Sequence, residues 1–157
     1  MFFNKKKMAL CYMVAIFFIV LDRLLKMIAF YNFQGRGMNL FRDFLQFTFV
    51  KNYYIALSLP LSGVFLNFII IILIFLILFY AFVLYKKQEW EIATALTIIG
   101  IAAISNIYDR LMYGFVIDYL SIKWFSVFNL ADSMIVLGVL SVILLFGGKN
   151  GQQTKTA

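Results

Sequence analysis

The sequence predicts a membrane protein that is mainly α-helical, a four-helix transmembrane bundle with a small extracytoplasmic β-sheet between the first two spans. Of its 157 residues, 64% are hydrophobic and only 13% are charged. The mean hydropathy of +0.95 lies outside the range of a soluble domain. Four apolar runs each approach the roughly 20 residues that cross a bilayer as a helix. A chain this short has room for one integral membrane domain over residues 1–157.

The first span is expected over residues 8–29, directly after a basic cluster at residues 5–7. Its first half resembles a signal peptide, but no small-residue cleavage site follows it. The run ends instead in a charged group formed by Asp22, Arg23 and Lys26. We therefore interpret it as a retained span.

The other spans are expected over residues 64–85, 92–112 and 129–146, and residues 147–157 form a polar C-terminal tail. Residues 30–63 form an outer segment, which is too long for a tight turn and too polar to span. Within it, residues 45–49 alternate apolar with polar side chains and are rich in β-favouring types. A strand is predicted there, in a short sheet lying on the outer surface of the membrane.

The lysines predict the orientation of the chain. With four spans, the lysines at 5–7, 86, 87, 149 and 155 fall on one side, which is expected to be cytoplasmic and to hold both termini. The opposite side holds a smaller basic group: Arg36, Arg42, Lys51 and Lys123.

The composition excludes several functions. The chain has no histidine, which removes Ser-His-Asp and Cys-His nucleophilic sites and the usual zinc sites. Its single cysteine, Cys11, has no partner within the chain and is interpreted as a packing residue. The net charge of +7 does not indicate nucleic-acid binding, because the basic residues flank apolar runs and form no patch.

The remaining polar residues converge at one depth. In this topology the first and third helices run outward and the fourth runs inward, so the outer ends of three helices carry unusual polar side chains. Ionisable groups near hydrocarbon are costly and generally face a bundle interior or a wet cavity. The converging residues are Asp22, Lys26, Asn52, Asn106, Asp109, Arg110, Asp118, Asn129 and Asp132.

Each of these residues also has an ordinary structural interpretation. Asp22 and Lys26 are four residues apart and suit a structural ion pair, and Asp109 beside Arg110 suits an interfacial anchor. Residue 129 suits an N-cap, and residue 132 suits a negative charge in a first helical turn. Asp118 lies in an aromatic-rich turn, where a carboxylate is often merely exposed.

Taken in order, these residues form four motifs. They are Asp22-Arg23-Leu24-Leu25-Lys26; Asn52-Tyr53-Tyr54-Ile55-Ala56; Asn106-Ile107-Tyr108-Asp109-Arg110 with Gly114-Phe115-Val116-Ile117-Asp118; and Phe128-Asn129-Leu130-Ala131-Asp132-Ser133. On these motifs the chain resembles the lipoprotein signal peptidases, also called signal peptidase II. Motif order, spacing and span count agree from about Leu21 to Gly138.

The resemblance implies an aspartyl protease of the bacterial cytoplasmic (inner) membrane, with its site near the outer face. Asp118 and Asp132 would be the catalytic pair. The residues that shape or support the site would be Asp22, Lys26, Asn52, Asn106, Asp109, Arg110 and Asn129. The substrate would be a lipid-modified prolipoprotein, cut just before a diacylglyceryl-modified Cys. We expect a monomer among membrane lipids that uses no metal or other cofactor.

The chain also departs from the family pattern. The first motif usually carries Gln and Thr at the positions of Arg23 and Leu25. The second usually carries glycine near Asn52, where residues 53–55 are bulky, and the glycine-rich approach to the third is reduced to Gly100. Bulkier residues restrict the close approach of a backbone. These departures bear on substrate specificity more than on chemistry.

Two carboxylates held close together share one proton near neutral pH, which lets the charged one activate water and the protonated one stabilise an oxyanion. Three other functions stay open at this point. A non-catalytic relative would bind lipidated signal peptides without cutting them. A small transporter would use intramembrane charges as an ion pathway. A phosphotransferase would hold Mg²⁺ on Asp109, Asp118 and Asp132.

Overall fold

The computed structural model describes residues 5–53 and 63–153. In chain order the elements are α1 (Lys5–Asn32), β1 (Met38–Phe41), β2 (Leu45–Asn52), α2 (Val64–Lys86), α3 (Trp90–Tyr113), β3 (Val116–Ile122), β4 (Val127–Phe128) and α4 (Leu130–Gln153). The predicted four-helix membrane fold with a small sheet is confirmed, because all four helices are long and apolar enough to cross a membrane. Part of the second motif, Tyr54 to Ala56, lies outside the described residues.

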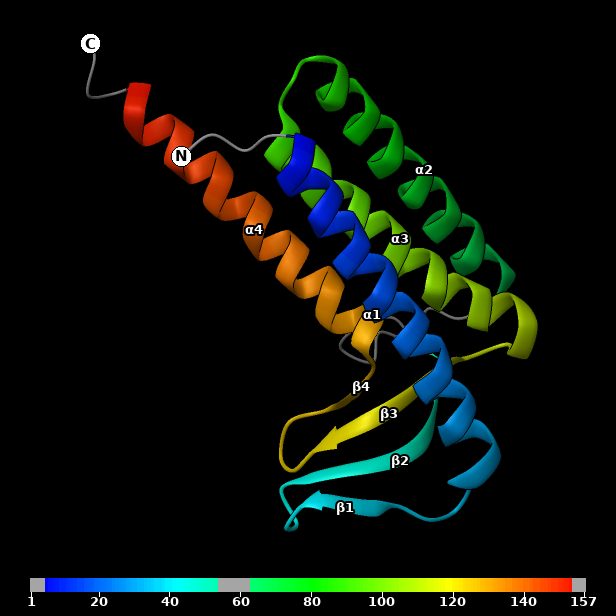
Figure 1. Ribbon diagram of the computed structural model, residues 1–157. Coiled ribbons are helices and arrows are strands. Elements are labelled where there is room, and N and C mark those ends of the chain that lie inside the picture. The colour runs from blue at the N-terminus through cyan, green and yellow to red at the C-terminus, as the bar shows by residue number, and fades with distance from the viewer. Residues whose placement is uncertain (1–4, 54–62, 154–157) are drawn as a thin grey trace.

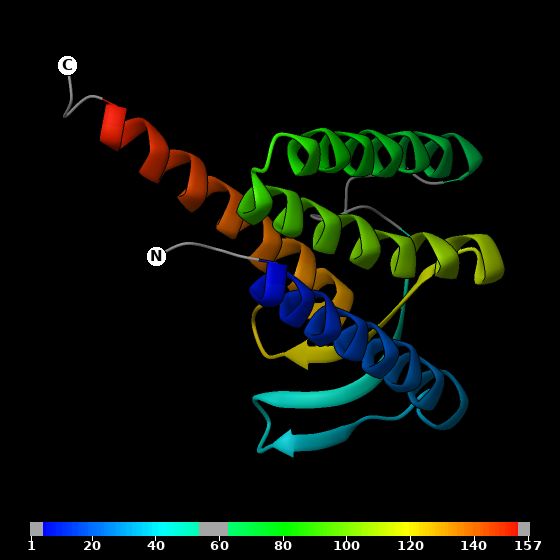
Figure 2. The same ribbon diagram turned by 45° about the horizontal axis from the view of Figure 1, so that its top comes forward.

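Helix α3 lies in the middle of the bundle, between α2 and α4, and α1 packs across it (Figures 1 and 2). Half of the most apolar 18-residue segment of α3 is buried within the protein, against 11–17% of the corresponding segments in the other helices. Two glycines permit close helix packing. A Cβ on Gly100 would lie 2.4 Å from Leu78 Cδ2, and a Cβ on Gly138 would lie 2.5 Å from Ile99 Cγ1. Small residues at such crossings are typical of membrane helices.

The sheet packs against the C-terminal end of α1 (Figure 1). Its strand order is β1-β2-β3-β4, and every neighbouring pair is antiparallel. The predicted strand at residues 45–49 is part of β2. Strands β3 and β4 lie between α3 and α4 and were not predicted, so the sheet joins the α1–α2 and α3–α4 connections of the chain. A cluster of Ala29, Phe47, Phe115, Ile117 and Tyr119 forms the core between the sheet and α1.

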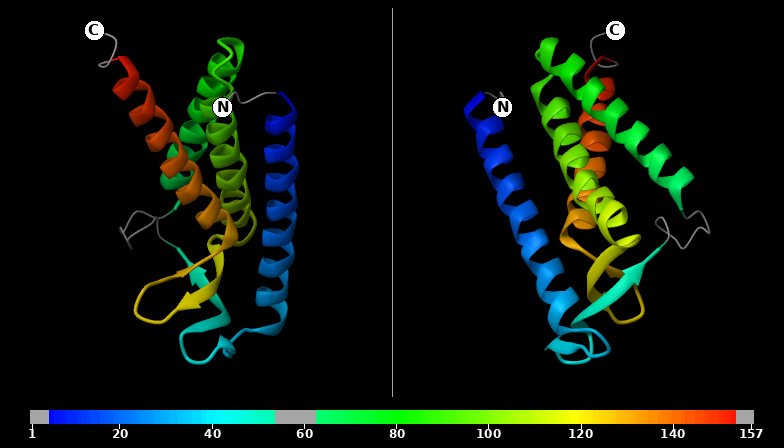
Figure 3. Two further views of the ribbon diagram at one scale, coloured as in Figure 1. Left: turned by 60° about the vertical axis from the view of Figure 1, so that its left-hand side comes forward. Right: turned by 90° about the vertical axis from the view of Figure 1, so that its right-hand side faces the viewer.

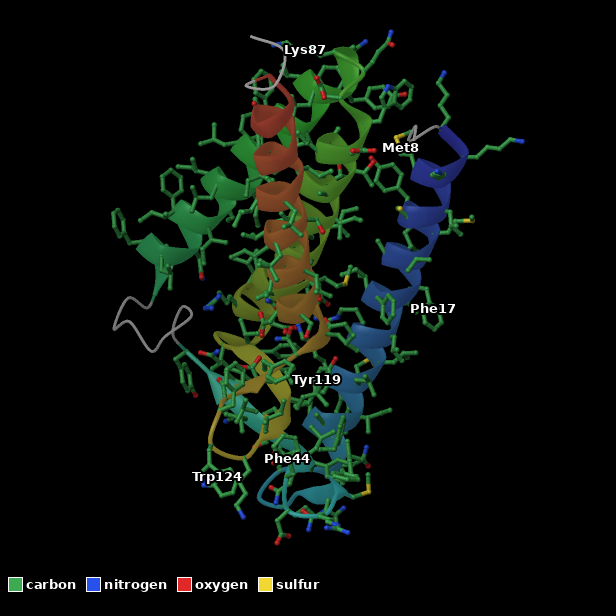
Figure 4. The ribbon with its side chains drawn as sticks, turned by 90° about the vertical axis from the view of Figure 1, so that its left-hand side faces the viewer. Met8, Phe17, Phe44, Lys87, Tyr119 and Trp124 are labelled. Atoms are coloured by element: carbon green, nitrogen blue, oxygen red, sulfur yellow. The ribbon has the colours of Figure 1, made fainter. Side chains whose placement is uncertain are left out.

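The helix ends differ from the predicted bounds. Helix α1 begins at Lys5 and α4 continues to Gln153, so the predicted polar tail from residue 147 is helical in its first part. The α2–α3 turn and the ends of α1 and α4 nearest the termini lie at one end of the bundle (Figure 3). Figure 4 places Lys87 and Met8 at that end, with the sheet at the other.

Candidate active site

The candidate site lies where the C-terminal halves of α1 and α3 and the start of α4 meet β2 and β3. The sequence predicted that nine polar residues converge, and the structure connects eight of them by hydrogen bonds and ion pairs: Asp22, Lys26, Asn52, Asn106, Asp109, Asp118, Asn129 and Asp132. The charge of the ninth, Arg110, interacts with Asp118, Asp132 and Asp109. Figure 4 shows Tyr119 at this level, between the helices and the sheet.

Lys26 is the centre of a buried ionic cluster between α1 and α3. Its Nζ lies 3.1 Å from Asp22 Oδ2 and 2.9 Å from Asp109 Oδ2, and it donates to Asn106 Oδ1 at 2.8 Å. The side chains of Lys26, Asp22 and Asp109 are all fully buried. An ammonium has three N–H donors, and here each has an acceptor. The Asp22–Lys26 ion pair therefore exists, but as part of a larger network.

Asp109 receives a second cation from Arg23. The Arg23 Nη1 atom lies 2.5 Å from Asp109 Oδ1, and the guanidinium lies 4.7 Å from the centre of the Tyr108 ring. The other carboxylate oxygen, Oδ2, accepts from the backbone N–H of Ile117 at 3.3 Å as well as from Lys26. Asp109 thus connects α1, α3 and β3. These contacts agree with a structural role for Asp109, although the residue is fully buried within the protein.

Asp22 connects α1 to three other elements. Ser105 Oγ donates to its Oδ2 at 2.8 Å, and Tyr119 Oη and the N–H of Ala131 donate to its Oδ1 at 3.0 and 3.3 Å. Burial, together with the charge of Asp22, raises the pKa of the Tyr119 phenol above its ordinary value. The hydroxyl therefore stays protonated and keeps donating to Asp22.

Asn129 links the two remaining carboxylates. Its Oδ1 accepts from the N–H of Asp132 at 2.9 Å, while Asp132 Oδ2 accepts from the N–H of Asn129 at 3.2 Å. This reciprocal pair is a capping box at the start of α4. The Nδ2 of Asn129 also donates to Asp118 Oδ1 at 2.7 Å. The N-cap interpretation is thus correct, and the same side chain also holds Asp118.

Asp118 is 1% exposed and lies in strand β3, so its interpretation as an exposed turn residue is wrong. Gly114 ends α3 with a φ of 82°, a left-handed conformation that suits glycine, and β3 begins two residues later at Val116. In the sheet Asp118 pairs with Val50 of β2. Asn52, two residues further along β2, therefore shares its face and donates from Nδ2 to Asp118 Oδ2 at 2.9 Å.

Burial raises the pKa of the Asp118 carboxyl from 3.8 to about 7, and the negative charge of Asp132 adds to the rise. Hydrogen bonds from Asn52 and Asn129 oppose this shift, because they stabilise the charged form. Asp132 itself accepts from Asn106 Nδ2 at 2.7 Å. Asn52, Asn106, Arg110 and Asp132 are half-buried, whereas the Lys26 cluster is closed off from the surface. Asp132 thus lies on the partly exposed side of the network, while Asp118 is itself buried and contacts the half-buried Asn52.

Three residues of this network were not predicted as site residues: Arg23, Ser105 and Tyr119. Arg23 carried a usable signal, because an arginine inside an apolar run needs a buried partner. Ser105 lies four residues before Asp109 on α3, a spacing that puts both on one helix face. Tyr119 carried no signal, because its role depends on β3 being a strand that turns Tyr119 and Asp118 to opposite faces.

The comparison with protein families decides the identity of the chain. The family model described as Signal peptidase (SPase) II matches residues 14–147, which include every predicted site residue. The chain belongs to the signal peptidase II family. Signal peptidase II is a protease, so this family member is an enzyme, and it is a multi-pass membrane protein.

Curated relatives agree with this membership, and a solved structure has the same fold. The signal peptidase II chain is 35% identical to a lipoprotein signal peptidase of Desulfitobacterium hafniense over 87% of its own length and 91% of the relative. It is 37% identical to one of Caldicellulosiruptor bescii, over 85% and 88% of the two chains. A bacterial membrane enzyme solved by the in meso method at 2.3 Å has the same fold, with a TM-score of 0.78 and 23% identity over 92% and 91% of the chains.

Proposed function

We propose that this chain is an aspartic endopeptidase that removes signal peptides from diacylglyceryl-modified prolipoproteins. Asp118 and Asp132 would share one proton, and their charged member would take a proton from the attacking water. The observation that carries the proposal is the double role of Asn129, which donates to Asp118 and caps Asp132 within one motif. That arrangement supports two carboxylates held close together by one side chain.

The other polar residues then have supporting roles. Asn52 and Asn106 each donate to one of the two carboxylates, which fixes the carboxylate planes. Arg110 is half-buried beside the pair and would orient the substrate carbonyl or balance the charge of the site. Lys26, Asp22 and Asp109 lie behind this layer and would support its geometry without touching substrate.

An apolar cavity that extends from Ala15 and Met134 toward Glu91, at the bundle end opposite the sheet, supports a lipidated or signal-peptide substrate. Its volume is about 580 Å³. It lies between α1, α3 and α4, and among its lining residues are Cys11, Ala15, Ile98 and Met134. Ala15 and Met134 also pack in a cluster with Ala131, next to Asp132. Cys11 is half-buried in this lining.

The same contacts weigh against two of the other functions. In the described part of the chain, α2 carries no charge before Lys86, and the buried ionic cluster occupies one half of the bundle, which does not suit an ion pathway. Both oxygens of Asp109 already bind cations of the chain, which does not suit Mg²⁺ ligation by that residue. The polar geometry by itself does not separate cleavage of a lipidated signal peptide from binding without cleavage, and the assay below separates the two.

We further infer that the enzyme is a monomer in the bacterial cytoplasmic membrane, with both termini in the cytoplasm. Lys5, Lys6, Lys7, Lys86 and Lys87 lie at the bundle end opposite the sheet, which supports this orientation (Figure 4). The candidate site would then open near the outer face. The mechanism assigns no step to a metal, an organic cofactor or nucleic acid.

The test uses purified protein in lipid, incubated with a diacylglyceryl-modified prolipoprotein or with the same protein lacking the lipid. Mass spectrometry of the products should show cleavage directly before the modified Cys, only in the lipidated substrate and equally with chelator present. Equal cleavage of both substrates would contradict the proposed specificity. Loss of cleavage with chelator would contradict the metal-free mechanism, and binding without cleavage would indicate the non-catalytic relative.

The activity should fall as pH rises through about 7. Because the folded pKa of Asp118 is raised, the proton that the pair needs is present below that pH and is lost above it. On the alkaline side, kcat/KM should decline by about tenfold per pH unit. As the pH rises from 3.8 to about 7, the same shift lowers the folding stability, because in this range the unfolded chain releases the proton and the folded chain retains it.

A pH series of initial rates in lipid, with unfolding followed in parallel, checks this prediction. The variant Asp43→Asn should give the same profile as the wild type, because Asp43 is an exposed residue in the β1–β2 turn. A rate that stays constant from pH 6 to 9 would contradict a shared proton on Asp118 and Asp132.

A further inference from the structure

Two turns at the edge of the sheet carry exposed aromatic side chains. Trp124 is 88% exposed and Phe125 is 78% exposed in the β3–β4 turn, and Phe41 is 63% exposed beside the β1–β2 turn. The backbone N–H of Lys123 donates to the carbonyl of Phe44 at 2.9 Å, so the two turns lie side by side (Figure 4). The tip cluster is defined here as Phe41, Arg42, Phe44, Lys123, Trp124 and Phe125.

The backbone conformation at two positions of the tip cluster does not favour the residue types found there. Arg42 has a φ of 46° and Trp124 a φ of 63°, left-handed conformations that suit glycine or asparagine and cost energy for larger residues. Neither side chain gains compensation from burial, since both are exposed. A large exposed aromatic at such a position is available for contact with something outside the chain.

The length of α1 places the sheet at the depth of lipid headgroups. Its 28 residues extend over about 42 Å, while the hydrocarbon core is about 30 Å thick. The apolar part begins at Met8, so about 20 residues bring the helix to the edge of the core near Ile28. Ala29, the next residue, is buried and belongs to the core cluster shared with the sheet.

The charges near the tip cluster suit an anionic surface. On the sheet side, the exposed charged residues that the structure describes are the cations Arg36, Arg42, Lys51 and Lys123 and the one carboxylate Asp43. The Lys123 ammonium lies 4.8 Å from the centre of the Trp124 ring, so an apolar ring and a cation form one unit. Aromatic rings combined with basic side chains are typical of segments that bind anionic membrane interfaces.

We propose that the tip cluster anchors the sheet to anionic phospholipid headgroups of the adjacent leaflet. Arg42 and Lys123 bind headgroup phosphates, and Trp124, Phe125 and Phe41 insert among the upper acyl chains. The anchored turns close the hairpins whose strands carry Asn52 and Asp118. Lipid contact therefore fixes the height of these two residues relative to the bilayer.

The test follows the fluorescence of Trp124 and does not depend on cleavage. The chain has two tryptophans, so Trp90→Phe leaves Trp124 as the only reporter. The variant is reconstituted into vesicles of phosphatidylcholine and phosphatidylglycerol in equal parts, with bromine on the acyl chains of one lipid at a time. Brominated phosphatidylglycerol should quench Trp124 about two- to fivefold more strongly than brominated phosphatidylcholine.

Adding Arg42→Gln and Lys123→Gln should equalise the two lipids, whereas Lys86→Gln with Lys87→Gln, at the opposite end of the bundle, should leave the preference unchanged. Circular dichroism verifies that each variant is folded. Equal quenching by both lipids in the Trp90→Phe protein would overturn the anionic preference. Quenching of Trp124 by aqueous iodide and not by brominated lipid would overturn membrane contact altogether. Protection of Trp124 from both quenchers that increases with protein concentration would also overturn it, because it would indicate that a second copy of the chain covers the tip cluster.

Discussion

Replacing either Asp118 or Asp132 by asparagine is expected to lower kcat/KM for the lipidated substrate by about 10³-fold or more, since general acid–base groups contribute about 10²–10⁴-fold each. Asparagine has nearly the same shape, but it cannot ionise or transfer a proton at neutral pH. The proposed mechanism needs one charged and one protonated carboxyl, so either substitution removes it.

The measurement is the initial rate in lipid vesicles, with Asp43→Asn as the matched control for the same chemical change outside the site. Both oxygens of Asp118 accept from amide NH₂ groups. The NH₂ group introduced by Asp118→Asn would therefore face another N–H donor, with no hydrogen bond between them. A thermal unfolding curve for each variant therefore has to accompany the rates. A folded variant that keeps more than a tenth of the wild-type rate would contradict the assignment of that residue to catalysis.

Local sequence patterns predicted the helices well, because each apolar run is long enough to specify a span by itself. They also predicted the capping role of Asn129, since the spacing from Asn129 to Asp132 fixes a capping box without help from the rest of the fold. The convergence of the nine polar residues followed from topology alone: alternate spans run in opposite directions, so the C-terminal ends of α1 and α3 and the N-terminal end of α4 lie at the same end of the bundle.

Contacts between distant segments were not predictable in the same way. Strand β3 follows α3 with a single helix-ending glycine, and its seven residues form a strand because β2 offers an edge to pair with. Once that pairing is set, Asp118 faces Asn52 and Asn129 while Tyr119 faces Asp22. Because side chains alternate along a strand, a shift of one residue would exchange these partners. No local pattern in the β3 segment fixes that register.

Arg23 illustrates a departure from the family pattern that becomes understandable in the structure. Where the family usually carries glutamine, this chain places a second cation on Asp109, so the buried carboxylates Asp22 and Asp109 are matched by two cations, Arg23 and Lys26. Within the described residues, no buried side-chain nitrogen or oxygen is left without a hydrogen-bond partner. The ionic layer behind the two catalytic candidates is therefore neutral and internally satisfied.

That layer should be the most sensitive part of the fold to a single substitution. Lys26→Met keeps the length of the side chain but removes the ammonium that binds Asp22, Asp109 and Asn106. Removing one partner of a buried ion pair leaves an uncompensated charge and typically costs about 3–5 kcal/mol. We expect a loss of this size in the free energy of unfolding, measured in detergent micelles by denaturant titration.

A second variant separates the lost charge from lost packing. Lys26→Met combined with Asp22→Asn removes the uncompensated carboxylate, while Asp109 keeps Arg23 and the N–H of Ile117. The double variant should therefore be more stable than Lys26→Met alone, although the introduced amide retains only part of the hydrogen bonding that Ser105, Tyr119 and Ala131 give to Asp22. Lys87→Met, an exposed change at the far end of the bundle, should alter stability by less than about 0.5 kcal/mol. If Lys26→Met lowered the free energy of unfolding by no more than Lys87→Met does, the ionic layer would not hold α1 to α3. The stability of this helix crossing would then have to come from apolar packing alone.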